Sequence, residues 1–226
     1  MPLKKSQTNV VFFLAFLNGL AAFGIDSSLP AFDEIRPDIG LLEGSNQISL
    51  IITIYIIGVS IGQIICGPFT DRFGRIASLK FGLAIYMIGA LGSLLSQNLL
   101  TILIFRFFWG LGSSVPASMR TTIARDLYSG NEMAKVMSKI MAVFLLGPII
   151  TPLISEGFLT FTNWRVVYSL GIILGGVGIL WSLWFGETLP TNKRRALNWE
   201  ITTKSFKKIF STRITIGYVL AVTFGQ

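Results

Sequence analysis

The chain has 226 residues, of which 52% are hydrophobic and only 13% carry a charge. Its 18 phenylalanines and its mean hydropathy of +0.67 lie far from the average of water-soluble globular domains. These values indicate an integral membrane protein. The single cysteine, Cys66, excludes an internal disulfide, and without histidine the sequence offers no zinc site and no Cys-His catalytic pair. We expect no metal and no cofactor.

Nearly uncharged apolar runs predict six membrane-spanning helices. About 20 apolar residues are needed to cross the hydrocarbon core of a bilayer, and such runs extend over 6–25, 46–69, 79–96, 99–119, 140–158 and 166–186. The first helix is expected to continue through Asp26 to about residue 30, and Arg106 interrupts the fourth run. Because the runs are continuous and do not alternate, they predict helices and not the strands of a membrane barrel.

The rest of the chain divides into a linker and a short seventh run. Residues 1–190 form the predicted six-helix transmembrane bundle, 191–212 a basic cytoplasmic linker and 213–226 the truncated start of a seventh helix, because the last run is too short to cross. The predicted fold class is an all-α membrane protein. The basic N-terminus resembles a signal peptide, but no small-residue cleavage site follows, so the first run is interpreted as an uncleaved span.

Lys and Arg are distributed unequally between the two ends of the predicted helices. If the N-terminus is cytoplasmic, sixteen of them lie on the cytoplasmic side and only Arg36 and Arg165 on the outer side. The positive-inside rule then predicts a multi-pass protein of the bacterial inner membrane with a cytoplasmic N-terminus. The lipid bilayer accounts for the net charge of +8, and no nucleic-acid partner is needed.

A short charged turn separates the second and third apolar runs. Residues 67–75 read GPFTDRFGR and bring together Gly67, Asp71, Arg72, Gly74 and Arg75. Glycine permits close approach of backbones, and charges at helix ends can pair, so we interpret the turn as a conformational latch. The alternative is a solvated basic loop. This turn resembles the signature loop of the major facilitator superfamily of secondary transporters.

Further motifs narrow the resemblance to the drug:proton antiporters of that superfamily. RFFWGLG at 106–112, RTTIARDLY at 120–128, GPIITP at 147–152, NWR at 163–165 and ETLP at 187–190 resemble the bicyclomycin and chloramphenicol-resistance branch. The resemblance implies proton-coupled export of drugs or small amphipathic molecules by alternating access between two six-helix bundles. It also implies that this chain is the N-terminal half only, with protons, a drug-like substrate and a C-terminal half as partners.

Two charges lie inside the predicted membrane helices. Counted from outer boundaries near residues 32 and 99, Asp26 and Arg106 lie six and seven residues deep, about 10 Å at roughly 1.5 Å per residue. Charges within a membrane are costly and usually functional, and a carboxylate facing an arginine can change its protonation as access alternates. We therefore predict that Asp26 and Arg106 form a proton-coupling site in the substrate cavity. The alternatives are a structural ion pair and an Asp26 that reaches the outer surface.

The fifth run contains Gly147, Pro148 and Pro152. Proline cannot donate a backbone hydrogen bond, so this motif predicts a helix kink, although membrane helices also tolerate proline without such a role. Glu156, near the end of the same run, is interpreted as an interfacial acid. We expect four aromatic residues to face lipid or the membrane interface: Phe108, Trp109, Trp181 and Trp184.

Export has two alternatives from other function classes. The sequence contains no nucleophile-base pair, metal cluster or phosphate loop, so we expect no enzyme. A non-transporting truncated remnant or a membrane interaction subunit is the main alternative to an exporter. Because alternating access requires two bundles, we expect that the 226 residues alone do not transport.

Overall fold

The computed structural model describes residues 6–194 together with Ser211 and Gly217. The chain divides into two compact units, Met1–Arg194 and Arg195–Gln226. The predicted start of the seventh helix and most of the predicted linker fall in the second unit, which lies almost entirely outside the described residues. The first unit holds the six predicted spans.

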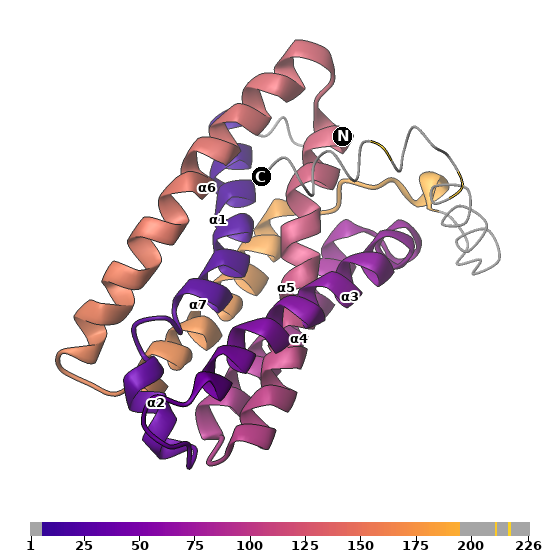
Figure 1. Cartoon of the computed structure of the whole chain (residues 1–226). Coiled ribbons are helices and arrows are strands. Elements are labelled where there is room, and N and C mark those ends of the chain that lie inside the picture. The colour runs from indigo at the N-terminus through magenta and orange to yellow at the C-terminus, as the bar shows by residue number, and fades with distance from the viewer. Residues whose placement is uncertain (1–5, 195–210, 212–216, 218–226) are drawn as a thin grey trace. The chain divides into compact units, whose positions relative to one another are not determined.

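Six long helices make up the first unit (Figure 1). Each is long and apolar enough to cross a membrane, and the described residues contain no strand, so the prediction of an all-α membrane protein with six spanning helices is confirmed. The long helices are α1 (Gln7–Asp26), α3 (Leu50–Phe73), α4 (Arg75–Leu95), α5 (Leu99–Leu127), α6 (Gly130–Leu159) and α7 (Trp164–Phe185). The short ones are α2 (Phe32–Asp38), η1 (Asn46–Ser49) and η2 (Thr191–Lys193).

The observed helix boundaries differ from the predicted ones. The prediction placed the boundaries near charged residues, whereas a helix can continue through a charged residue. Helix α4 begins at Arg75 and α6 at Gly130, four and ten residues before the apolar runs were expected to begin. Helix α1 ends at Asp26 and does not continue to residue 30. Between α1 and α3 lies α2, a seven-residue helix that the charge pattern did not reveal.

Local chemistry explains where several helices start. The side-chain oxygen of Asn98 accepts a hydrogen bond from the Thr101 amide at 2.9 Å and caps α5. Asn163 caps α7 in the same way through the amides of Arg165 and Val166. Between α3 and α4 the chain needs only Gly74, whose φ of +93° is a conformation that favours glycine. The predicted charged turn is therefore a one-residue break between two helices.

Helix α5 lies at the centre of the bundle and packs against α1, α3 and α4, while α6 packs mainly on α1 (Figure 1). Small residues allow these close contacts. A Cβ atom on Gly110 of α5 would collide with the backbone carbonyl of Tyr55 on α3, and one on Gly58 of α3 would collide with the backbone carbonyl of Phe107. The reciprocal glycines thus fix the distance between α3 and α5.

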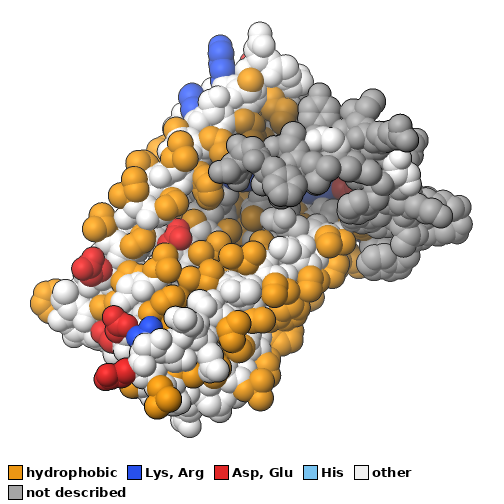
Figure 2. Space-filling model, viewed as in Figure 1, with side chains coloured by type: hydrophobic (Ala, Val, Ile, Leu, Met, Phe, Trp, Pro, Cys, Tyr) orange, Lys and Arg blue, Asp and Glu red, His pale blue; other side chains and the backbone are white. Residues whose placement is uncertain are grey.

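On the face that Figure 2 shows, apolar side chains lie over much of the surface, Lys and Arg side chains lie at the top, and Asp and Glu side chains lie toward the lower left. Leu145, Ile149 and Leu153 on α6 are 69%, 61% and 63% exposed, as expected for a helix that faces lipid or another membrane bundle. We call the end with Asp33, Glu34, Asp38 and Glu43 the acidic end. The opposite end, with Arg72, Arg75, Arg125 and Lys135, is the basic end.

Candidate functional site

Arg106 is fully buried in the first third of α5. Its Nη1 donates a hydrogen bond to the Gly24 carbonyl oxygen at 2.7 Å, and its Nη2 donates to the Ser28 hydroxyl. The Tyr168 hydroxyl of α7 also donates to Ser28, at 3.4 Å. The guanidinium group therefore joins α5 to the end of α1 and, through Ser28, to α7.

Aromatic rings enclose the guanidinium group. Its Cζ atom lies 4.7 Å from the ring centroid of Trp109 and 4.3 Å from that of Tyr168, distances at which a cation is attracted to the face of a ring. Trp109 is fully buried, so the expectation that it faces lipid or the interface is wrong. The expectation fits Trp184, which is 93% exposed.

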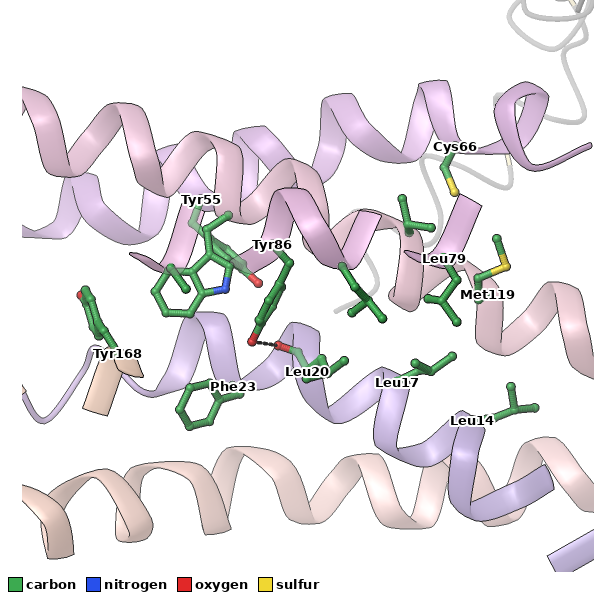
Figure 3. Close-up of a cluster of buried hydrophobic side chains, with 14 of the residues drawn as sticks. Leu14, Leu17, Leu20, Phe23, Tyr55, Cys66, Leu79, Tyr86, Met119 and Tyr168 are labelled. Carbon is green, nitrogen blue, oxygen red and sulfur yellow. Dashed lines mark hydrogen bonds between the residues drawn. The ribbon is translucent and has the colours of Figure 1, made fainter. Parts of the chain in front are cut away.

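Hydroxyl groups of tyrosines continue this buried cluster toward the middle of the bundle. The Tyr86 hydroxyl donates to the Leu20 carbonyl oxygen at 3.3 Å (Figure 3). Tyr55 and Ser113 share a hydrogen bond of 2.5 Å, and the Tyr55 hydroxyl lies 3.1 Å from the Ala21 carbonyl oxygen. These bonds fix α1 against α3, α4 and α5.

Asp26 is half-buried at the C-terminal end of α1, between the two residues that Arg106 binds. Gly24 and Ser28 flank it by two positions each, so Arg106 and Asp26 reach the same end of the bundle. Among the described residues, however, Asp26 makes no ion pair and no hydrogen bond through its side chain. The facing pair that we expected is not formed in this structure. Arg106 instead binds a carbonyl group that the helix end leaves unpaired, where the helix dipole also favours a cation.

The predicted latch forms a network at the basic end, centred on the buried side chain of Arg75. Nη1 of Arg75 lies 2.7 Å from the Asp71 carboxylate and 3.0 Å from the Thr70 hydroxyl. Its Nε atom lies 3.0 Å from the carboxylate of Asp126 on α5. The network thus joins the end of α3, the start of α4 and the end of α5.

Glu187, two residues beyond α7, completes this network. Its carboxylate accepts hydrogen bonds from the amides of Arg75 and Ile76 at 2.9 and 3.4 Å, where the first turn of α4 has unpaired N–H groups. It also accepts from the amides of Thr188 and Leu189, both at 3.0 Å. A carboxylate is favoured at this position because the N-terminal end of a helix carries partial positive charge.

The remaining latch residues have different surroundings. A Cβ atom on Gly74 would collide with the Glu187 carboxylate, whereas Gly67 has nothing within 4 Å of the corresponding position. Arg72 is exposed, and its Cζ atom lies 5.4 Å from the Phe73 ring centroid. The roles of Asp126 and Glu187 were not predicted from sequence, although both lie in the motifs quoted above, because their partners are distant along the chain.

Helix α6 continues without interruption through Pro148 and Pro152. Gly147 lies against α1, since a Cβ atom there would be 3.4 Å from the Ala22 Cβ. The predicted kink therefore does not break the helix, and a role for it stays a prediction. Glu156 is exposed three residues before the end of α6.

A third polar cluster holds α2 against the start of α7 at the acidic end. The Asp38 carboxylate accepts a hydrogen bond from Trp164 Nε1 at 2.9 Å and one from the Arg165 guanidinium. Glu34 accepts from the Trp164 amide at 3.1 Å. The hydrogen bond from Trp164, followed by that from Arg165, holds the pKa of Asp38 below its ordinary value. In the part of the chain that the structure describes, no group of three or more Cys, Asp or Glu side chains is arranged to hold a metal ion.

Six helices long and apolar enough to cross a membrane, with the buried cation Arg106 among them, define a multi-helix integral membrane protein. The family model described as Major Facilitator Superfamily matches residues 11–226, so the chain belongs to this superfamily. The chain is 30% identical over 226 residues to the "Uncharacterized MFS-type transporter YdgK" of Bacillus subtilis (strain 168), covering 99% of this chain and 56% of the relative.

Two further similarities concern the sequence and the fold. The chain is 28% identical over 225 residues to the "Bicyclomycin resistance protein homolog" of Haemophilus influenzae, covering 98% of this chain and 55% of that protein. The proton:xylose symporter XylE has a similar fold, with a TM-score of 0.73 at 13% identity, over 97% of this chain and 54% of XylE. The chain spans about half the length of the curated relatives that it matches.

Proposed function

We propose that this protein takes part in the proton-coupled export of drugs or small amphipathic molecules across a bacterial inner membrane, with its N-terminus in the cytoplasm. Membership of the superfamily and the similarity to a bicyclomycin resistance homologue support export of this kind. The excess of Lys and Arg at the basic end supports the orientation. The observation that carries the proposal is the Asp26 carboxyl group, without an ion-pair partner among the described residues, at the same end of the bundle as the buried cation Arg106.

In this proposal Asp26 binds the coupled proton, and Arg106 positions the segment of α1 that carries Asp26. The side chain of Asp26 is partly exposed, so it can exchange a proton with a cavity. Arg106 is buried and binds Gly24 and Ser28, which stand two positions before and after Asp26 in the sequence, so its positive charge lies at the same end of the bundle as the carboxylate. Water, burial and a nearby cation each change the balance between an acid and its carboxylate, which lets alternating access drive uptake and release of the proton.

In the proposed transport cycle, the network around Arg75 acts as the conformational latch. Alternating access requires two bundles that move against each other around a site between them, so the proposed transport belongs to an assembly with a second bundle. Asp71, Arg75, Asp126 and Glu187 stabilise one arrangement of the basic end, and loss of these bonds would shift the population toward the other arrangement.

The test measures proton release when bicyclomycin is added to the purified chain in weakly buffered detergent. If drug and proton compete, binding of one must release the other because their coupling is reciprocal. We expect release from the parent chain, none from Asp26→Asn, and undiminished release from the matched control Glu156→Gln. Release that persists in Asp26→Asn would overturn the proposed role of Asp26, and absence of release from the parent would show that this bundle by itself does not couple bicyclomycin binding to a proton.

A further inference from the structure

A second arginine lies on the same face of α5, toward its basic end. Arg120 follows Arg106 by fourteen residues, nearly four helical turns and about 21 Å at 1.5 Å per residue. It is half-buried, and its Nη1 donates to the side-chain oxygen of Asn18 on α1 at 2.8 Å. By sequence Arg120 is one of the basic residues that determine orientation, but its side chain points into the bundle.

Arg120 has no carboxylate partner among the described residues. Its Cζ atom lies 5.5 Å from the ring centroid of Phe144 on α6, and its neutral partner Asn18 is only 2% exposed. Asp71 and Asp126 both pair with Arg75 at the helix ends, so these two carboxylates do not neutralise Arg120. A half-buried cation without a counterion is costly.

Two donor atoms of this pair are buried and unpaired. Nδ2 of Asn18 and Nε of Arg120 have no hydrogen-bond partner within the described part of the chain, although buried donors nearly always have one. A guanidinium group has five N–H donors and an amide nitrogen has two. Each of the two groups therefore still has a donor available, and only an acceptor is missing. Helices α1, α5 and α6 thus bring together unpaired donors, one positive charge and one aromatic ring.

We propose that Arg120, Asn18 and Phe144 form a binding site for the anionic group, a carboxylate or a phosphate, of an aromatic or otherwise amphipathic molecule. Arginine binds such oxyanions through strong charge-assisted hydrogen bonds, and the ring of Phe144 offers an apolar surface beside them. The inference rests on the proposed function insofar as this molecule is the exported one. Binding itself requires neither proton coupling nor a second bundle.

The experiment measures binding of 1-naphthoate to the full chain by titration calorimetry in phosphatidylcholine nanodiscs, with empty nanodiscs subtracted. The neutral probe 1-naphthamide has the same shape without the charge. We expect Arg120→Gln to weaken naphthoate binding by about tenfold or more, as loss of a charge-assisted hydrogen bond predicts, and to leave naphthamide binding unchanged. Arg125→Gln is the matched control, since Arg125 is exposed five residues further along the same helix.

A second variant keeps the test decisive if Arg120→Gln fails to fold. Asn18→Asp is nearly isosteric and places a carboxylate at the oxygen that already lies 2.8 Å from Arg120. A carboxylate of the protein itself then occupies the proposed anion site. It should abolish naphthoate binding and raise the unfolding temperature. Naphthoate binding by Asn18→Asp equal to that of the parent, or equal binding of both probes by the parent, would overturn the proposal.

Two further arms identify the source of the anion and separate this proposal from the proposed function. Adding phosphatidylglycerol to the nanodiscs weakens naphthoate binding if a lipid phosphate occupies the site, and leaves it unchanged if the site takes a soluble anion; both results support an anion site. Naphthoate binding that depends on Arg120 stands even if the parent chain releases no protons with bicyclomycin, so failure of the proposed function is distinguishable from failure of this proposal. Naphthoate binding that Arg120→Gln leaves unchanged would contradict the proposal.

Discussion

Replacing Glu187 with glutamine should destabilise the basic end of the bundle. One oxygen of the carboxylate accepts from the amides of Arg75, Thr188 and Leu189, while the other accepts from the Ile76 amide and lies 3.6 Å from the Arg194 guanidinium. Glutamine retains one acceptor oxygen and places an NH2 group against the remaining donors. The variant therefore loses a helix-terminal charge and leaves N–H groups of α4 unpaired.

The expected magnitude follows from these contacts. Loss of a charge-assisted hydrogen bond at a helix start costs about 0.5–2 kcal/mol, and the interaction with the helix dipole contributes about 0.3–1 kcal/mol. The exposed fraction of the Glu187 side chain is 31%, so water screens part of this energy, and we expect a total loss of about 1–2 kcal/mol. That corresponds to a fall of several degrees in unfolding temperature for a unit of this size, at about 2–4 °C per kcal/mol.

Two measurements test this estimate. Thermal unfolding in detergent gives the overall loss, and amide hydrogen exchange at Arg75 and Ile76 reports the first turn of α4 directly. Glu43→Gln is the matched control because Glu43 is exposed at the acidic end and makes no hydrogen bond among the described residues. If exchange at Arg75 and Ile76 were as slow in Glu187→Gln as in the parent, the assignment of Glu187 as the cap of α4 would be wrong.

Two further predictions concern the acidic end and the centre of the bundle. Because the pKa of Asp38 is lowered in the folded chain, its contribution to stability should be present above about pH 4 and lost as the pH falls through the lowered value; unfolding temperature measured against pH should show this loss in the parent but not in Asp38→Asn. Gly110→Ala should cost about 1–3 kcal/mol through overpacking against the Tyr55 carbonyl, whereas Gly19→Ala, with open space at its Cβ position, should be neutral or stabilising. Thermal unfolding of both glycine variants tests the packing of α3 on α5. Equal losses of stability in the two variants would contradict it.

The six spanning helices were predictable from sequence because lipid cannot hydrogen-bond to a backbone, which forces long apolar runs into helices. The helix ends were less predictable, since a helix such as α6 continues into charged sequence once its backbone is already hydrogen-bonded. Helix α2 was missed for a related reason: its short acidic sequence has no apolar run, and it is held by contacts with Trp164 and Arg165 on distant α7.

The charged residues of the candidate site were found from sequence, but most of their partners were not. A charge inside an apolar run is visible without a structure, which identified Asp26 and Arg106. Trp109 lies one helical turn from Arg106 on the same helix, but Gly24 and Ser28 precede Arg106 by 82 and 78 residues and Tyr168 lies on α7, so only the fold brings these three to the guanidinium group. Counting the depth of Asp26 and Arg106 along their helices predicted that both lie at the same end of the bundle. It could not predict the direction in which each side chain points.

The central claim is that the carboxyl group of Asp26 binds and releases a proton within the bundle. Infrared difference spectroscopy of the chain in lipid nanodiscs tests this most directly, because the carbonyl band of a protonated carboxyl group disappears on ionisation as the pH is raised. We expect a titrating carboxyl band in the parent and in Glu156→Gln that is missing in Asp26→Asn. The same titrating band in Asp26→Asn, or a parent in which no such band depends on Asp26, would contradict the claim.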